Sequence, residues 1–181
     1  MNEKERPKSA ALSIALMSVL TAVVVVFTIF PRIPTPIHGY INLSDVIITF
    51  SAYLFGPWVA AVAGGLGTGL ADIIGGFPQW APFSFLIHGL QGIMIALIAR
   101  IGLKKGVPGD AKIYMQILGG VVGMVIMAGG YYVVGGFLYG FRAALVEIPL
   151  NLIQSGVGVI LGIVVSKSVL KAYPAVRSLA L

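Results

Sequence analysis

The sequence predicts an all-α integral membrane protein with six transmembrane helices. Hydrophobic residues make up 58% of the 181-residue chain and charged residues only 10%, whereas a soluble domain usually carries about 25% charged residues. The mean hydropathy is +0.99. A transmembrane helix needs about 20 apolar residues, so the chain has room for about six spans and for no separate soluble domain. Residues 1–181 are therefore expected to form a single six-helix transmembrane domain.

The apolar runs give the expected positions of these helices. The first run, Ser9–Phe30, ends before a proline and is too long for the apolar region of a cleavable signal. Residues 41–74 are longer than one span needs, and the Gly-Pro pair in "FGPW" at 55–58 predicts a break between two short helices. The remaining three spans are expected at residues 83–101, 113–139 and 143–166.

Lysine and arginine predict the orientation, because cytoplasmic loops carry an excess of both. With the N-terminus inside, only Arg32 and Arg142 fall outside. The other basic residues, expected in the cytoplasm, are Lys4, Arg6, Lys8, Arg100, Lys104, Lys105, Lys112, Lys167, Lys171 and Arg177. Both termini are therefore predicted to be cytoplasmic. The net charge of +6 then reflects orientation, and no nucleic-acid partner is expected.

Polar residues within the spans share one depth, the outer half of the predicted bundle. They are Asn42, Asp45, Asp72, Ser84, His88, Gln91, Tyr131, Tyr132, Glu147, Asn151 and Gln154, and Gln116 is the exception. Those of the fourth span and those of the sixth each follow i, i+4, i+7, so each set forms a stripe on one helical face. This pattern predicts a polar cavity open to the outside. The other interpretation is that these side chains hold helices together through hydrogen bonds of about 0.6 kcal/mol each.

The candidate substrate-binding residues combine aromatic rings with hydrogen-bonding groups. They are Trp80, His88, Gln91, Tyr131, Tyr132, Glu147 and Asn151. A small, flat, hydrogen-bonding heteroaromatic ligand suits such a set. Hydroxymethylpyrimidine, pyridoxine or thiamine would fit, and Arg142 leaves pantothenate as a further choice.

Metal and cofactor sites are not expected. The chain has no cysteine, and His88 is accompanied only by His38, without the carboxylate spacing of a metal site. The glycine-rich "GGLGTGLADIIGG" lies within a span and follows no strand, so it does not predict a phosphate-binding loop. The GxxxG pairs Gly65/Gly69, Gly119/Gly123 and Gly158/Gly162 instead predict close helix packing.

The first helix carries a flat stripe of small residues. Ala11, Ala15, Ser18 and Ala22 follow i, i+4, i+7 and i+11, which places them on one helical face. We expect this stripe to pack closely against another helix, either in this chain or in a partner protein.

Several stretches resemble the substrate-binding S components of bacterial energy-coupling factor (ECF) vitamin transporters, which are short six-helix membrane proteins. "ALSIA" at 11–15 resembles the Ala-x-x-x-Ala motif of their first helix. "INLSDVIITFSAYLFGPWVAAVAGGLGTGLADIIGG" at 41–76 is similar to their second and third helices, with an Asp, a Gly-Pro pair and many glycines. "FPQWAPFSFLIHGLQG" at 77–92 and "IPLNLIQSGVG" at 148–158 are similar to their fourth and sixth.

The resemblance implies a protein that captures a scarce vitamin or precursor with high affinity from outside a bacterial cell membrane. It also implies docking onto a transmembrane coupling protein driven by two cytoplasmic ATPase subunits, with Ala11 and Ala15 as docking residues. The substrate site would lie in the outer half, under the loop after the first helix and the loop between the third and fourth. The resemblance does not fix the substrate.

Two other classes of function remain open at this point. One is a membrane assembly subunit without a ligand. The other is an intramembrane enzyme that uses Glu147 and His88 as acid and base. Catalysis would need a nucleophile, metal or cofactor beside the base, and the sequence contains no motif for one, so no catalytic residue is predicted.

Overall fold

The computed structural model describes residues 10–36, 39–101, 103 and 111–180. His38 and the basic residues at 4, 6, 8, 104 and 105 lie outside this described part. The elements are α1 (Ala10–Ile29), β1 (Ile33–Pro34), β2 (Tyr40–Ile41), α2 (Ser44–Leu54), α3 (Pro57–Gly75), α4 (Ala81–Ala99), α5 (Ile113–Tyr139), α6 (Phe141–Ala144), α7 (Glu147–Ala172) and the 3-10 helix η3 (Pro174–Leu179).

Helices occur at all six predicted positions, and the all-α membrane fold is confirmed. In the described part of the chain, five helical stretches are long and apolar enough to cross a membrane: α1, α3, α4, α5 and the continuous stretch Phe141–Ala172. The sixth, α2, has only 11 residues. At 1.5 Å per residue, α2 covers about half of a hydrocarbon core of about 30 Å. The six-span count and the cytoplasmic placement of both termini therefore stay predictions.

The predicted break between α2 and α3 is confirmed. Gly56 has φ 114°, a conformation that favours glycine, and Pro57 is the first residue of α3. The last predicted span is displaced, because Gly140, at φ 95°, starts the separate turn α6. α7 then begins at Glu147 and continues past the predicted end to Ala172. Lys167 and Lys171 lie in this extension, where long basic side chains can reach the polar membrane surface.

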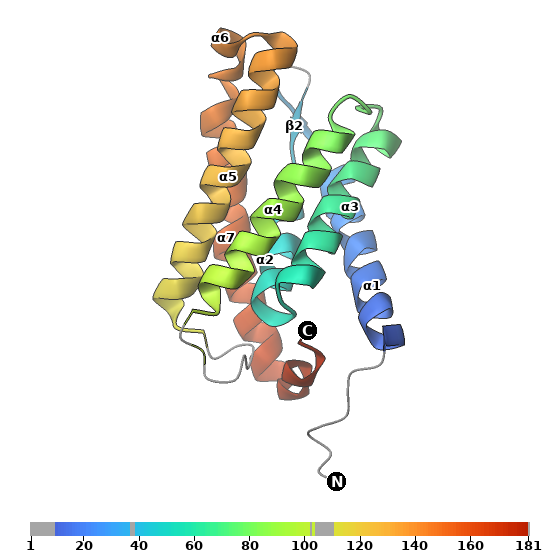
Figure 1. Ribbon diagram of the computed structural model, residues 1–181, viewed down its shortest axis with the longest axis vertical. Helices are drawn as coiled ribbons and strands as arrows, with labels where there is room; N and C mark the ends of the chain where they lie inside the picture. The colour runs from blue at the N-terminus through green and yellow to red at the C-terminus, as the bar shows by residue number, and fades with distance from the viewer. Residues whose placement is uncertain (1–9, 37–38, 102, 104–110, 181) are drawn as a thin grey trace.

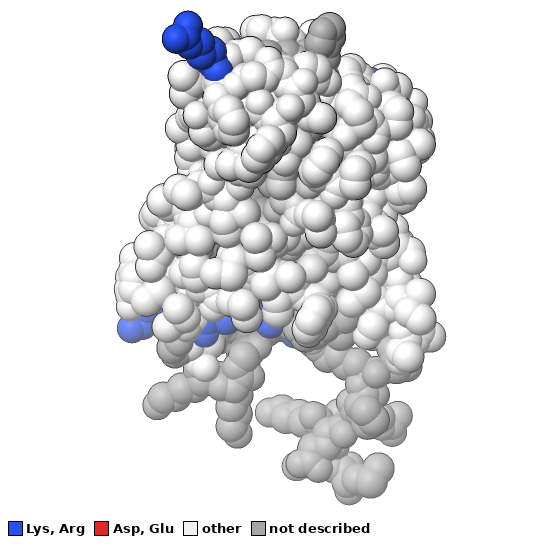
Figure 2. All heavy atoms as spheres, turned by 45° about the horizontal axis from the view of Figure 1, so that its top comes forward, with Lys and Arg blue, Asp and Glu red and all other residues white. Residues whose placement is uncertain are grey.

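The helices form one bundle with α2 at its centre (Figure 1). α2 packs against α7, α3 and α4, while α4 packs between α3 and α5, and α1 lies on the outside against α3. β1 and β2 pair antiparallel, with Ile33 opposite Ile41. The start of α1 and the end of α7 lie at one end of the bundle, and β2 lies toward the other (Figure 1). Between the two ends, a broad band of the face in Figure 2 shows no charged side chain.

Glycines bring the central helices together, as the GxxxG spacing predicts. A methyl group on Gly158 would lie 2.3 Å from Cβ of Asp45, and one on Gly162 would lie 2.7 Å from Cβ of Thr49. These two glycines therefore allow α7 to pack directly on α2. Gly119 packs in the same way against the carbonyl oxygen of Ile95, 2.7 Å from its would-be methyl group.

The small-residue stripe of α1 faces outward. Ala11, Ala15, Ser18 and Ala22 are all exposed, whereas Leu20, Val24 and Thr28 form the buried face of this helix. The sequence left open whether the stripe packs within this chain or against a partner. In the structure it does not pack within this chain.

Candidate substrate cavity

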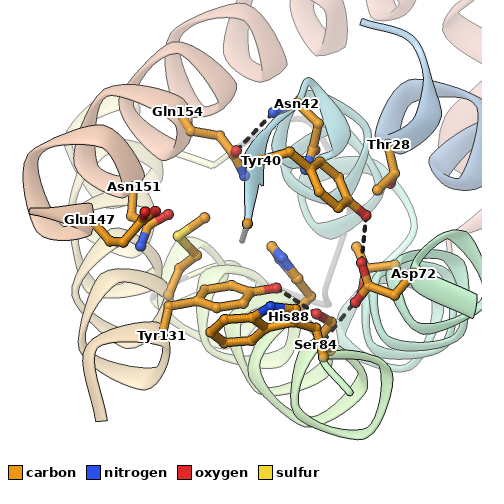
Figure 3. A pocket seen from close by; sticks show the side chains of 14 residues that line it. Thr28, Tyr40, Asn42, Asp72, Ser84, His88, Tyr131, Glu147, Asn151 and Gln154 are labelled. Carbon is orange, nitrogen blue, oxygen red and sulfur yellow. Dashed lines mark hydrogen bonds between the residues drawn. The ribbon is translucent and has the colours of Figure 1, made fainter. Parts of the chain in front are cut away.

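A cavity lies at the β2 end of the bundle, enclosed by side chains from α1, β2, α3, α4, α5 and α7 (Figure 3). The space inside it that is open to the centre of a water molecule is about 40 Å³. A cavity that just fits one water has almost no such space, because the centre of that water cannot move, so this cavity has room for several waters. Its lining consists of Thr28, Gly39, Tyr40, Asn42, Thr68, Asp72, Trp80, Ser84, His88, Met127, Tyr131, Glu147, Asn151 and Gln154.

Aromatic rings from α5, from α4 and from the residue just before α4 form one wall of the cavity. The ring centroids of Trp80 and Tyr131 are 5.6 Å apart, with 53° between the ring planes. His88 meets Tyr131 edge to face at 5.7 Å. Trp80 also contacts Tyr139 at 5.8 Å, which supports the indole from behind. Contacts of this kind stabilise aromatic pairs, so these rings support one another at the edge of the cavity.

Hydrogen bonds join polar groups of β2 to α3 and of α4 to α5. The Tyr40 hydroxyl donates to Oδ1 of Asp72, and the hydroxyls of Ser84 and Tyr131 lie 2.7 Å apart. Burial, followed by the neighbouring Asp72 carboxylate, raises the pKa of Tyr40 far above its usual range. The phenol therefore keeps its proton and acts as the donor to Asp72.

The stripe of α7 forms a second wall. Glu147, Asn151 and Gln154 all line the cavity, one turn or less apart on the same face (Figure 3). Oε1 of Gln154 accepts a hydrogen bond of 2.9 Å from the backbone N–H of Asn42. The side chain of Asn151 makes no hydrogen bond to any residue in the described part of the chain, so its amide is available to a ligand.

A fully buried carboxylate lies outside the cavity lining. Asp45 on α2 is 0% exposed. Its Oδ2 accepts a hydrogen bond of 2.7 Å from Nε2 of Gln154, and its Oδ1 accepts from Nε2 of Gln91 and from the Ser155 hydroxyl. Asp45, Gln91, Gln154 and Ser155 are called the Asp45 network below.

The loop after α1 is fastened to the end of α3. Nη1 of Arg32 donates a hydrogen bond of 3.1 Å to the carbonyl oxygen of Gly75. The guanidinium carbon lies 4.4 Å from the centroid of the Tyr40 ring and 5.5 Å from that of Phe77. These two rings touch each other at 5.0 Å. Because Tyr40 lines the cavity, this Arg32 clasp joins the segments that cover it.

Most of the sequence-predicted residues meet in this cavity. Trp80, His88, Tyr131, Glu147 and Asn151 line it. Tyr132 does not, and its ring packs instead on Phe141 at 5.7 Å. Gln91 is fully buried in the Asp45 network, and Arg142 is exposed.

The structure also brings in residues that are not among the predicted site residues. Thr28, Thr68 and Met127 line the cavity but belong to apolar stretches that gave no signal. Four other lining residues belong to the polar set that the sequence places in the outer half: Asn42, Asp72, Ser84 and Gln154. Their shared depth is the sequence signal that points to the cavity. Across the described residues, no group of three or more His, Asp or Glu side chains could hold a metal ion.

Comparison with known proteins adds independent information. Residues 8–171 match the family described as "ECF-type riboflavin transporter, S component". The thiamine precursor transporter HmpT of Lactococcus lactis subsp. cremoris is 32% identical over 153 residues, which cover 84% of this chain and 82% of HmpT. An uncharacterised protein of Pyrococcus woesei is 39% identical over 140 residues, covering 77% of this chain and 88% of that protein.

A solved structure shares the fold. The S component of a bacterial ECF transporter superimposes with a TM-score of 0.65 at 22% sequence identity, covering 90% of this chain and 98% of the solved chain. The arrangement of helices around the cavity is therefore that of a known class of membrane protein.

Proposed function

Because the chain belongs to the family of ECF-type riboflavin transporter S components, we propose that its cavity binds a single-ring vitamin precursor related to hydroxymethylpyrimidine. A member of this family is the substrate-binding component of an importer, a transport protein and not an enzyme. The thiamine precursor named for the relative HmpT is the ligand class that agrees with the cavity. Riboflavin, named in the family description, agrees with it less well.

The size of the cavity is the observation that favours a single-ring precursor over riboflavin. A space of about 40 Å³ for the centres of water molecules suits one six-membered ring with small substituents after modest adjustment of side chains. The fused rings and sugar-like chain of riboflavin would require the aromatic wall and the α7 wall to move apart. Trp80 and Tyr131 are fixed by their contacts with each other and with Tyr139, which opposes such a movement.

The polar groups suit the edges of a pyrimidine ring. The free amide of Asn151 offers both donors and an acceptor, and Asn151 and Tyr131 border the same cavity (Figure 3). A flat ring lying against Trp80 or Tyr131 would present its nitrogen atoms and its substituents to the polar side chains. Pyridoxine and thiamine share parts of this chemistry and are the natural competitors to test.

The test is mass spectrometry of any ligand released from the purified protein, followed by titration calorimetry. We expect hydroxymethylpyrimidine to bind, and riboflavin to bind at least about tenfold more weakly. Recovery of bound riboflavin, or tight riboflavin binding by the purified protein, would overturn the proposed ligand. Recovery of a chemically changed ligand would favour an enzyme, and a protein that binds none of these compounds would favour the assembly subunit.

We propose further that α1 docks onto the transmembrane coupling protein of an importer with two cytoplasmic ATPase subunits, in the cell membrane. The exposed stripe of Ala11, Ala15, Ser18 and Ala22 supports this proposal. Ser18 and Ala22 also line an apolar groove between α1 and α3, together with Leu66 of α3. Small residues on both helices of a contact allow their backbones to approach closely.

Replacement of Ala11 and Ala15 by Trp tests the docking role. The double variant should lose transport in cells while the purified protein keeps its ligand affinity, because the stripe lies outside the cavity lining. The matched control replaces Leu12, an exposed residue between them on the same helix, with Trp. Equal loss of transport in the control, or loss of ligand binding in the double variant, would count against docking through this stripe.

A further inference from the structure

The Asp45 network joins the cavity to a carboxylate that is not part of the cavity lining. Asp45 lies on α2, and its three donors come from α4 and α7. Two of them, Gln91 and Gln154, also bond toward the cavity: Gln154 lines it, and Oε1 of Gln91 lies 2.7 Å from Nδ1 of His88. The direction of each bond in this network decides what the cavity offers to its ligand.

At one end of the network, the orientation of the Gln154 amide is fixed. The backbone N–H of Asn42 can only donate, so the oxygen of the Gln154 amide must face it, as it does at 2.9 Å. The Gln154 nitrogen then faces Oδ2 of Asp45 at 2.7 Å. Gln154 cannot turn over without placing two donors against each other.

The Asp45 carboxylate in turn determines the orientation of the Gln91 amide. A carboxylate has no hydrogen to donate, so the nitrogen of Gln91 must face Oδ1 of Asp45. Gln91 uses its second hydrogen on the Ser155 oxygen at 3.1 Å, and the Ser155 hydroxyl donates to Oδ1 of Asp45 at 3.1 Å. Both amide hydrogens of Gln91 and the hydroxyl hydrogen of Ser155 are thereby used, so Gln91 has only its oxygen left for His88.

We propose that Asp45 fixes His88 in the tautomer with its proton on Nδ1, so that Nε2 offers a lone pair to the ligand. An amide oxygen facing Nδ1 requires a hydrogen on that nitrogen, which leaves Nε2 of the neutral ring as an acceptor. The cavity then selects a ligand with a hydrogen-bond donor at this place, such as the amino group of an aminopyrimidine. It disfavours the analogue that carries a carbonyl oxygen there.

Asp45 acts in this scheme as a positioning residue, and the inference on selectivity rests on the proposed function. A role in helix packing alone makes a different prediction: loss of Asp45 would weaken binding of both pyrimidines alike and would not move a proton on His88. The two accounts can therefore be separated by a readout on the imidazole.

The isosteric variant Asp45→Asn should reverse the network without breaking it. Gln154 stays fixed by the N–H of Asn42, so the new amide must turn its oxygen to Gln154 and its nitrogen to Gln91. Gln91 then turns over, accepts from that nitrogen and from Ser155, and presents its own nitrogen to His88. The proton of His88 moves from Nδ1 to Nε2, and the cavity offers a donor in place of an acceptor.

The experiment is ¹⁵N NMR of histidine-labelled full-length protein in detergent, with a His38→Gln variant to identify the His88 signals. Without ligand, the wild type should show a protonated Nδ1 and an unprotonated Nε2, and Asp45→Asn should show the reverse. A wild-type His88 with its proton on Nε2, or with protons on both nitrogens, overturns the inference. The wild-type spectrum gives this result even if the variant does not fold.

Binding of an aminopyrimidine and its oxo analogue tests the selectivity. An unpaired buried polar group weakens binding about tenfold to a hundredfold, so the wild type should prefer the amino compound by about that factor. Asp45→Asn should reduce the ratio of the two affinities at least about tenfold. An unchanged ratio despite a reversed tautomer overturns the role of His88 in selectivity. Failure of the wild type to bind either pyrimidine overturns the proposed function, while the ligand-free spectrum still decides the tautomer.

Discussion

Gly158 leaves no room for a methyl group where α7 crosses α2, and this closeness can be tested with a matched pair of variants. In Gly158→Ala the new Cβ would lie 2.3 Å from Cβ of Asp45 and 2.9 Å from its carbonyl carbon. Neither atom belongs to a flexible side-chain end, so α2 and α7 must move apart. Gly156→Ala is the control on the same helix, because its new methyl group would meet only the end of Met124, at 3.5 Å.

The expected magnitudes follow from these distances. Overpacking a well-packed interior costs about 1–3 kcal/mol, and the two stiff contacts at Gly158 place it near 3 kcal/mol. Both variants gain about 1 kcal/mol of helix propensity from replacing glycine by alanine. The net change in the free energy of unfolding is therefore a loss of about 2 kcal/mol for Gly158→Ala and a gain of up to about 1 kcal/mol for Gly156→Ala.

Thermal unfolding of the detergent-purified variants measures the difference. A change of 1 kcal/mol shifts the Tm of a chain of this size by about 2–4 °C, so Gly158→Ala should melt roughly 6–12 °C below Gly156→Ala. If the two variants melt within about a degree of each other, α7 does not approach α2 as closely as the structure shows. A Gly156→Ala variant that melts well below the wild type would equally refute the assignment of open space beside Met124.

Three further predictions concern the cavity, its cover and the orientation of the chain. Asn151→Ala should weaken ligand binding by about tenfold to a hundredfold in calorimetry. Gln116 lies outside the cavity lining, so Gln116→Ala should bind like the wild type. Equal losses of affinity in both variants would indicate a general defect in folding. Arg32→Ala should speed ligand release several-fold in stopped-flow measurements, because it removes the clasp on Tyr40 and Gly75. Arg32→Lys should release the ligand almost as fast, since a lysine cannot stack its charge as a planar group does. An unchanged release rate would mean that the ligand leaves by another route. Tags at the two termini should be accessible only from the cytoplasm, and detection of one tag from outside would contradict the orientation inferred from Lys and Arg.

The helices and the depth of the site could be predicted because they depend on local patterns. The Gly-Pro pair at 56–57 marks the end of α2, and the stripe of Glu147, Asn151 and Gln154 follows the helical repeat onto one wall of the cavity. The GxxxG pairs likewise report contacts that any close helix pair needs. In each of these cases, the residues whose spacing predicts the feature are the same residues that form it.

Other features depend on neighbours that the sequence does not reveal. Tyr131 and Tyr132 are adjacent and chemically alike, but consecutive helical residues point about 100° apart, and only the position of α4 decides which one meets the cavity. Gln91 shares a face with His88 but lies three residues further along α4, about 4.5 Å deeper. Thr28 bonds its own helix at the Val24 carbonyl oxygen, 2.7 Å away, which is typical of a structural threonine.

The burial of Asp45 has a consequence for how the chain enters the membrane during synthesis. Its donor Gln154 follows 109 residues later in the sequence, so this bond can form only when most of the protein has been made. Until then a carboxylate in the membrane interior costs about 2.5–3.5 kcal/mol, and α2, with 11 residues, is too short to span the hydrocarbon core by itself. α2 is therefore expected to stay near the membrane surface at first and to take its central place only after α7 has emerged. The last long helix of the chain would thus complete the insertion of the second.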